Sequence, residues 1–405
     1  MKVAAIISEY NPFHSGHEYQ IKALRSLLGE DTAVVTIMSG NYTQRGEIAI
    51  ADKTVRARAA VECGVNLVLE LPFPYSMSSA EFFAKSGVKI AREIGVVDYL
   101  VFGSECGDIS LLSDIAAVSS SPEYQLTLDS LMEDDEFKNF GYPELAQIAL
   151  SKVYGKEISK TLLSPNNILA IEYIKAISSL DADITPITIK REGAGYLDII
   201  NPMQNHQSAS AIREELYSGN ASALDFVPDL AKNVFLEAKK EGKLPADFSI
   251  LDSAVISYFR LNTPKSDTDI QDAQGGLYNR ICDMSAEANS ISSLTALVET
   301  KKYTKARIRR AIWNSYFGVT SSVVRELPFY TQVLAMDTVG RSLLKRIKKT
   351  SDFPVITKPS SYREHNMRVI LQKELSNKAD AIYALAHKNP YPGRFALTFT
   401  PYVKD

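Results

Sequence analysis

Two histidines, His14 and His17, stand three residues apart in the turn after the first apolar run of the chain, with Gly16 between them. An imidazole can donate a hydrogen bond to a phosphate oxygen as negative charge builds up during displacement at phosphorus, and a glycine permits close approach of the backbone to a ligand. Two solvated histidines are the alternative, but the chain holds only 5 histidines and two of them fall in this turn. The pattern therefore predicts a site that binds nucleotide phosphates.

A strand, a loop and a helix must position these histidines. Residues 3–7 form a short apolar run typical of a strand buried on both faces, Pro12 and Gly16 turn the chain, and a helical segment follows over residues 18–28. In such a unit the loop amides and the positive end of the helix dipole face a ligand beyond the carboxyl end of the strand.

The same alternation continues to about residue 220. We expect further strands over 33–38, 66–71, 99–102 and 184–189, and further helices over 52–63, 79–94, 168–177 and from 208 onward. Asp52 is the expected N-cap of the second helix. The pattern predicts a Rossmann-like α/β domain, in which a parallel sheet is covered by helices on both sides. Its functional residues should gather at the carboxyl ends of the strands.

Strand signals fade beyond residue 220, and helical periodicity dominates the rest of the chain. We therefore predict a catalytic domain over residues 1–225 and a mostly helical domain over residues 226–405. The charge divides in a similar way, since residues 1–220 hold 18 basic and 29 acidic residues, a net of −11, whereas residues 221–405 hold 27 and 19, a net of +8. The positive half is a candidate surface for a polyanion.

Basic residues cluster twice in this positive half, over residues 301–310 and over residues 341–349, and each group is expected on one side of a helix. A solvated helix face is the alternative for either group. Tyr303 and Trp313 stand close by for base stacking, however, and this combination favours nucleic acid. The predicted RNA-binding residues are Lys301, Lys302, Lys305, Arg307, Arg309 and Arg310.

The cysteines and the hydropathy indicate the compartment. The 3 cysteines, Cys63, Cys106 and Cys282, are too few and too scattered for a disulfide framework or a zinc site, so we expect a reducing, cytoplasmic location. No segment approaches the roughly 18 apolar residues of a membrane span, and no secretory signal opens the chain. We therefore expect no membrane partner. The sequence does not give the oligomeric state.

Two segments resemble the nucleotidylyltransferase superfamily with a HIGH-type motif, whose members hold ATP with a His-x-Gly-His loop and a late Ser-rich helix start. These segments are Asn11–His17 and Ser208–Arg213. An ordered series of motifs is similar to one narrower group, the tRNA(Met) cytidine acetate ligase family. The series is Glu9-Tyr10-Asn11-Pro12-Phe13-His14, Met38-Ser39-Gly40, Gln44-Arg45-Gly46, Glu70-Leu71-Pro72, Phe102-Gly103-Ser104-Glu105, Pro165-Asn166-Asn167-Ile168-Leu169, Gly193-Ala194-Gly195-Tyr196 and Lys301-Lys302-Tyr303-Thr304.

This resemblance implies an ATP-dependent ligase. Acetate and ATP would give acetyl-adenylate and pyrophosphate, and N4 of the wobble cytidine of elongator tRNA(Met) would then attack the acetyl carbonyl to give N4-acetylcytidine. Positioning and charge stabilisation would supply most of the catalysis. The sequence shows no metal-ligand cluster, so Mg²⁺ is expected to arrive with ATP.

The resemblance also implies roles for single residues. His14 and His17 are the expected catalytic residues and contact phosphates, and Gly103 lets the backbone approach adenosine. Asn167 and Arg191 complete the ATP site, while Asn166 is expected to cap its helix. The implied ATP-binding residues are Ile7, Ser8, Glu9, Tyr10, Asn11, Pro12, Phe13, His14, Ser15, Gly16, His17, Gly103, Asn167, Arg191 and Ser210.

The chain departs from the superfamily pattern in two places. Ser15 stands where the HIGH motif has isoleucine, and no lysine-rich KMSKS loop is present, so that Arg213 and the amides around it are the nearest counterpart. Four further cations could face pyrophosphate or RNA, with a solvated helix surface as the alternative for the last two. They are Arg45, Lys53, Arg56 and Arg58.

Two other functions remain open at this stage. An adenylyltransferase that makes a dinucleotide cofactor from a small phosphate ester would explain the first domain equally well, but it gives no reason for a basic second domain. A noncatalytic RNA-binding protein would explain the basic residues, but it gives no reason for the pair of His14 and His17.

Overall fold

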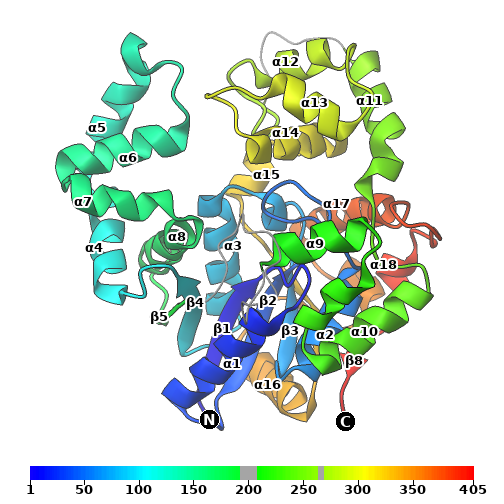
Figure 1. Ribbon diagram of the computed structural model, residues 1–405. Coiled ribbons are helices and arrows are strands. Elements are labelled where there is room, and N and C mark those ends of the chain that lie inside the picture. Colours follow the sequence, from blue (N-terminus) through cyan, green and yellow to red (C-terminus); the bar gives the residue numbers. More distant parts are fainter. Residues whose placement is uncertain (192–207, 263–268) are drawn as a thin grey trace.

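A single mixed sheet runs through the computed structural model, which describes residues 1–191, 208–262 and 269–405 (Figure 1). Its strand order is β5-β4-β1-β2-β3-β6-β7, with β8 beside β6. The strands are β1 (Val3–Ser8), β2 (Ala33–Ser39), β3 (Leu67–Leu71), β4 (Tyr99–Ser104), β5 (Thr185–Lys190), β6 (Thr331–Met336), β7 (Val355–Ile356) and β8 (Tyr402–Val403).

The first five strands are parallel and confirm the Rossmann-like prediction. From β1 the chain moves outward through β2 to β3, and then returns to the other side of β1 for β4 and β5. Strand order therefore reverses between β1 and β4, and ligands of open α/β sheets bind at such a point, outside the carboxyl ends of the strands. The loops after β1 and β4 are thus the first place to look for a site.

Alternate residues of each strand face two different helical layers. Val3, Ala5 and Ile7 belong to the core on one face, whereas Ala4 and Ile6 belong to the core on the other. This is the pattern of strands buried on both sides. The first layer consists of α3 (Ala80–Glu93), α4 (Ile109–Ser119), α8 (Pro165–Ser179) and α16 (Thr338–Thr350). The second consists of α1 (Ser15–Leu28), α2 (Lys53–Glu62), α9 (Ala209–Tyr217) and α10 (Asp229–Lys240).

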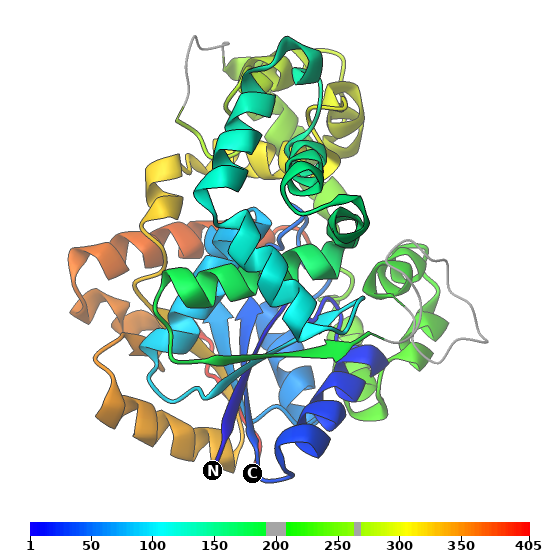
Figure 2. The same ribbon diagram turned by 90° about the vertical axis from the view of Figure 1, so that its left-hand side faces the viewer.

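Two helical arms rise beyond the carboxyl edge of the sheet, away from the chain termini (Figures 1 and 2). A Cβ at Gly141 would lie 3.0 Å from the carbonyl oxygen of Lys301, so the arms meet there. The first arm contains α5 (Pro122–Glu133), α6 (Tyr142–Val153) and α7 (Lys156–Ser159). The second contains α11 (Asp252–Leu261), α12 (Leu277–Met284), α13 (Ile291–Val298) and α14 (Lys305–Phe317).

The last part of the chain returns to the sheet, which sequence analysis did not predict. β6 pairs antiparallel with β3, and Leu67 lies opposite Met336. The expectation that strands end near residue 220 is wrong here, because a short apolar run of this kind cannot be told from a buried helix by periodicity alone. The division at residue 225 stays a prediction, but the sheet itself crosses it. The remaining helices are α15 (Ser321–Arg325), α17 (Met367–Tyr383) and α18 (Phe395–Thr398).

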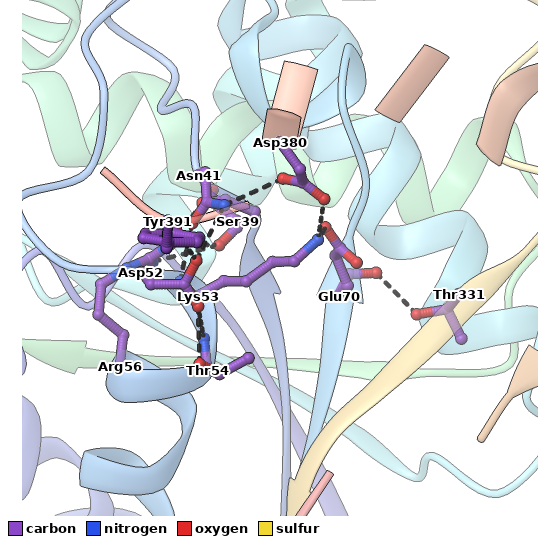
Figure 3. Close-up of polar contacts among 11 residues, drawn as sticks. Ser39, Asn41, Asp52, Lys53, Thr54, Arg56, Glu70, Thr331, Asp380 and Tyr391 are labelled. Carbon is purple, nitrogen blue, oxygen red and sulfur yellow. Dashed lines mark hydrogen bonds and ion pairs between the residues drawn. The ribbon is translucent and has the colours of Figure 1, made fainter. Parts of the chain in front are cut away.

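A buried ionic cluster joins α17 to the sheet and to α2 (Figure 3). The Nζ atom of Lys53 lies 2.6 Å from a carboxylate oxygen of Glu70 on β3 and 2.6 Å from one of Asp380 on α17. Burial lowers the pKa of Lys53, but the carboxylates of Asp380 and Glu70 outweigh this effect and raise it above its ordinary value. The ammonium group therefore stays charged. The prediction that Lys53 faces pyrophosphate or RNA is wrong, since its side chain is completely enclosed.

Substitution of Lys53 by methionine should destabilise the fold strongly. Two carboxylates would be left buried without their cation, and breaking a buried pair in this way costs about 3–5 kcal/mol. Arg58→Met is the matched control, because Arg58 lies on the same helix and pairs with Glu237 at the surface, where such pairs contribute about 0–1 kcal/mol. Denaturant unfolding of both variants measures the difference. Equal losses of stability would contradict the assignment.

Candidate active site

A cavity opens at the carboxyl edge of the sheet where the strand order reverses. β1 and the loop after it contribute residues 6–11, β4 contributes Phe102 and Gly103, and the end of β5 contributes Arg191. The start of α9 and the loop over residues 43–47 form the side facing the second layer of helices. The cavity lies where the strand order predicts a ligand.

The loop after β1 is held in an unusual backbone conformation. Tyr10 has a φ of 46°, a left-handed conformation that costs a non-glycine residue about 1–2 kcal/mol. Burial of its ring and a 3.2 Å hydrogen bond between its hydroxyl and Thr36 hold it there. Next to it, the side-chain oxygen of Asn11 accepts a 2.8 Å hydrogen bond from the amide of Ile50. The loop is therefore fixed before any ligand binds.

The two predicted catalytic histidines cap α1 with their rings. Nδ1 of His14 accepts a 3.0 Å hydrogen bond from the amide of Gly16, and Nδ1 of His17 accepts a 3.2 Å hydrogen bond from the amide of His14. A neutral imidazole whose Nδ1 accepts must carry its proton on Nε2. Both rings are thus held in the tautomer in which Nε2 is the donor, and their centroids are 3.9 Å apart.

His17 faces the cavity as a neutral group. Burial lowers its pKa well below the ordinary value of 6.5, and the nearby His14 and Arg191 lower it further. His14 is buried at the start of the helix and does not line the cavity. Of the pair, His17 is therefore the one with a ring directly on the cavity wall.

The start of α8 is tied to the loop after β4. The carboxylate of Glu105 accepts the side-chain amide of Asn166 at 2.6 Å and the backbone amide of Asn167 at 2.8 Å. An anion at this end of a helix is favoured by the helix dipole. Gly103, whose contact with adenosine is predicted, lies on the cavity wall just before this loop.

The expectation that Asn166 caps α8 is wrong, whereas the predicted contact of Asn167 with ATP stays a prediction. Asn167 is buried, and its side-chain oxygen accepts from the amides of Glu105 and Cys106 at 2.9 and 3.2 Å. Asn166 lies inside the first turn of α8, makes no side-chain cap and lines the cavity. The side chain of Asn167 therefore holds the loop after β4, and Asn166, whose side-chain amide donates to Glu105, lies on the cavity wall.

Arg213 and Glu47 form a polar wall that reaches into the second arm. Arg213 donates to the carbonyl of Asn11 at 2.9 Å and lies 3.3 Å from the Glu47 carboxylate. The same carboxylate also pairs with Arg309 of α14. Sequence analysis missed Glu47, because nothing in the chain marks a glutamate whose partners are so distant.

Gly46 lets α14 pack directly on this loop. Its φ is 72°, and a Cβ there would lie 2.6 Å from the Cβ of Arg309 and 2.6 Å from the amide nitrogen of Arg310. The Gln44-Arg45-Gly46 motif thus has two roles, because Gln44 and Arg45 line the cavity while the glycine admits the helix.

The structure separates the predicted ATP-binding residues into two groups. Those that line the cavity are Ile7, Ser8, Glu9, Tyr10, Asn11, His17, Gly103 and Arg191. Those that do not are Pro12, Phe13, His14, Ser15, Gly16, Asn167 and Ser210. Phe13 packs in the core beneath the loop, and the hydroxyl of Ser210 accepts from Arg213 at 3.3 Å. The motif residues Gly193 to Tyr196 lie outside the described residues.

Arg56 and Arg58 lie in different environments. Arg56 is completely buried and donates to the carbonyls of Ala51, Glu9, Ser39 and Gly40. The sequence predicts that Arg56 either contacts a ligand or lies on a solvated surface, and both predictions are wrong. Arg58 is a surface residue paired with Glu237, which agrees with the predicted alternative of a solvated helix surface.

The first basic group is only partly available to a ligand. α14 begins at Lys305, so Lys301 and Lys302 precede the helix. Arg307 donates to the carbonyls of Asp272 and Gln274, Arg310 pairs with Asp272, and Arg309 pairs with Glu47. Lys301, Lys302 and Lys305 are exposed.

The expectation that Tyr303 and Trp313 stack on bases is wrong. Trp313 is 1% exposed and Tyr303 is 8% exposed, and both belong to the apolar core of the second arm. Trp313 lies on the buried side of α14, and Tyr303 lies just before the helix with its hydroxyl donating to the carbonyl of Gly275. The predicted RNA contact therefore depends on the lysines alone.

The second basic group lies on α16, at the edge of the sheet opposite the arms (Figure 1). Its members are exposed, and in the described part of the chain no ion pair involves them. They are Arg341, Lys345, Arg346, Lys348 and Lys349. Their distance from the cavity edge distinguishes them from the first group.

Three general features complete the description of the chain. Cys63, Cys106 and Cys282 are not joined in disulfides. Within the described ranges, no group of three or more His, Cys, Asp or Glu side chains could hold a metal ion, and no helix is long and apolar enough to cross a membrane.

Comparison with known proteins gives consistent matches. The sequence profile of a family described as HIGH Nucleotidyl Transferase matches residues 1–395. The tRNA(Met) cytidine acetate ligase of Acetivibrio thermocellus is 35% identical to this chain over 99% of each protein. That of Caldanaerobacter subterraneus subsp. tengcongensis is 36% identical over 100% of each. The crystal structure of Thermotoga maritima TmcAL bound with alpha-thio ATP matches with a TM-score of 0.91, at 29% identity and 100% coverage of both chains.

Stability should depend on pH through His17. The unfolded chain takes up a proton as the pH falls through about 6.5, whereas the folded state keeps His17 neutral, so the free energy of unfolding falls as the pH falls. His17→Asn keeps an acceptor for the His14 amide and removes the titration. Denaturant unfolding at pH 7.5 and 5.5 should show that the stability of the unaltered protein falls by about 1 kcal/mol more than that of the variant. A pH-independent difference would contradict this assignment.

Proposed function

The chain belongs to the HIGH nucleotidyl transferases and, among them, to the tRNA(Met) cytidine acetate ligases, and we propose that it activates acetate as acetyl-adenylate before it acetylates N4 of the wobble cytidine of elongator tRNA(Met). The observation that carries this proposal is the pair of imidazoles at the start of α1, each with its Nδ1 occupied. Such a pair supplies Nε2 donors at a helix N-terminus, where phosphate groups bind.

The proposed reaction has two steps. A carboxylate oxygen of acetate attacks the α-phosphorus of ATP, a new O–P bond forms, and the bond to pyrophosphate breaks. The N4 amine then attacks the acetyl carbonyl, the C–O bond to AMP breaks, and the amine loses one proton. Acetate becomes a useful electrophile only after the first step, because AMP is a far better leaving group than an oxide or hydroxide ion.

The cavity offers groups for each part of ATP. His17 and Arg213 are the donors proposed for the phosphates, with His14 behind them, and Mg²⁺ is proposed to enter as part of the nucleotide. Gly103 and Asn166 lie on the opposite side, where the backbone can approach adenosine. Hydrogen-bond donors that already point at the oxygens on which negative charge develops do not have to reorient during the reaction. Catalysis by positioning is therefore the mechanism that this cavity supports best.

The two alternative functions explain less of the molecule. A plain adenylyltransferase gives no reason for Arg309 of the second arm to share the Glu47 carboxylate with Arg213. A noncatalytic RNA-binding protein gives no reason for two imidazoles held in one tautomer at a cavity. The ligase uses both features, because its second substrate must reach the adenylate from the side of the arms.

We propose that the RNA lies along the exposed lysines at the start of α14. Arg309 contacts the cavity loop through Glu47. The three lysines, Lys301, Lys302 and Lys305, lie a few residues before it in the chain. The anticodon nucleotide is in a single-stranded loop already, so its extrusion costs less than opening a duplex. A cytoplasmic location is part of this proposal, because the tRNA substrate is found there.

Adenylation can be tested without RNA by acetate-dependent exchange between ATP and labelled pyrophosphate. The unaltered protein should catalyse the exchange, and the His14→Ala/His17→Ala variant should lose it by about a hundredfold or more, since removal of one oxyanion donor alone costs about 10²–10³ in kcat. RNA affinity should be unchanged in this variant. Exchange that does not require acetate, or that survives in the variant, would contradict the proposal.

The RNA surface can be tested by two triple variants with the same change of charge. Lys301, Lys302 and Lys305 become alanine in one, and Lys345, Lys348 and Lys349 of α16 become alanine in the other. Only the first should weaken tRNA binding, by roughly tenfold or more, and lower the salt dependence by about two or three counterions. Filter binding over a range of salt concentrations measures both effects. The opposite ranking would assign the RNA to α16.

A further inference from the structure

One wall of the cavity is apolar and has no part in the phosphate site. It is formed by Ile7 of β1, Phe83 of α3, Phe102 of β4, and Leu169 and Tyr173 of α8. Four of these side chains belong to the core beneath α3 and α8, and Leu169 packs against that core. The polar wall with Arg213 and Glu47 faces the other layer of helices. The cavity is therefore divided into two chemically different halves.

Tyr173 is the polar exception in this apolar wall. Its ring is 2% exposed and lies 5.5 Å from that of Phe102. Its hydroxyl is buried and has no hydrogen-bond partner among the described residues. A buried hydroxyl without a partner costs about 1–3 kcal/mol, so its presence on a cavity wall points to a ligand that accepts from it.

We propose that this apolar wall is the subsite for the small carboxylic acid, with the methyl group against Phe83 and Leu169 and the Tyr173 hydroxyl donating to one carboxylate oxygen. The other oxygen is then left to attack the α-phosphorus. This inference rests on the proposed function, which it deepens by naming the residues that select the acid. Tyr173 would be a substrate-binding residue of the activation step.

The nearby Glu9 does not compete for the Tyr173 hydroxyl. One of its carboxylate oxygens accepts the amide of Gln44 at 2.8 Å, and Arg213 and Arg45 face it from the polar side. The hydroxyl therefore remains available to the acid.

A nucleoside is the rival occupant of the same wall. Adenine presents ring nitrogens and an exocyclic amine that need several polar partners, and the wall offers one hydroxyl. The end of β4 and the start of α8 offer the backbone at Gly103 and the side-chain oxygen of Asn166 instead. A methyl group next to a carboxylate, by contrast, needs one apolar surface and one donor, which the wall provides.

The apolar wall also favours attack by the acid. A carboxylate that keeps one hydrogen bond and loses most of its hydration is a stronger nucleophile than one in water. Three large rings, those of Phe83, Phe102 and Tyr173, limit the room beyond the carboxylate and therefore favour a short acid.

The decisive experiment measures acetate-dependent ATP–pyrophosphate exchange in the Tyr173→Phe variant. The KM for acetate should rise roughly tenfold to a hundredfold, the range expected for a hydrogen bond to a charged group, while the KM for ATP changes less than about twofold. Because the deleted hydroxyl has no partner among the residues that the structure describes, thermal unfolding should be unchanged or occur at a slightly higher temperature. A folding defect can thus be separated from a binding defect.

Two further variants complete the test. Tyr124→Phe removes another buried tyrosine hydroxyl, which donates to the carbonyl of Ala146 in the first arm, and should leave both KM values unchanged. Leu169→Ala enlarges the wall and should shift the preference from acetate toward propionate and butyrate by at least about fivefold, with circular dichroism confirming the fold.

The outcomes separate this inference from the proposed function. A rise in the KM for ATP alone, or no change in either constant, in Tyr173→Phe would overturn the subsite and leave the acetyl-adenylate step intact. Absence of acetate-dependent exchange in the unaltered protein would overturn the acetyl-adenylate step and the subsite together.

Discussion

The cavity depends first on Arg56, a cation that forms no ion pair with any carboxylate in the described part of the chain. Its guanidinium is completely buried and donates to the carbonyls of Glu9, Ser39, Gly40 and Ala51. These carbonyls belong to the last residue of β2 and to the loops after β1 and β2, which would otherwise end in unpaired acceptors at the edge of the sheet. Burial lowers the pKa of Arg56, but a guanidinium remains charged in proteins, so five N–H donors are always present to hold the two loops together.

Lys53, one turn earlier on α2, extends the same constraint to the end of the chain (Figure 3). It pairs with Glu70 at the end of β3 and with Asp380 on α17, and Asn41 bridges Asp52 and Asp380. Two cations at the start of a helix oppose the helix dipole, so their positions there require strong partners from elsewhere. The partners come from both halves of the chain. The carboxyl edge of the sheet and α17 therefore form one polar unit, and the C-terminal segment is a structural part of this edge.

Local patterns predicted the elements that depend on local physics. The apolar runs of β1 to β5, the Asp52 cap and the histidine turn were all visible in the chain, because each involves residues close together in sequence. The errors concern long-range contacts. Arg56 is predicted to contact a ligand or to lie at the surface, because the carbonyls that surround it come from distant loops. Asn166 is predicted to cap α8, but its side-chain amide donates to Glu105 in the loop after β4. Glu47 and Tyr173 carried no local signal. The partners of Glu47 lie on distant helices, and the cavity beside Tyr173 is formed by several separate elements.

The neutral state of the histidines fits the chemistry better than a pair of fixed cations would. A permanently charged group binds the triphosphate of the ground state strongly, and such uniform binding does not accelerate the chemical step. A neutral Nε2 donor in a fixed tautomer gains most when charge shifts onto the oxygens around the α-phosphorus. Burial and the adjacent ring keep His17 neutral over the physiological range, and the amides of Gly16 and His14 fix the tautomers. The backbone of a single helical turn thus fixes the tautomers of both rings, while burial keeps His17, the imidazole on the cavity wall, neutral.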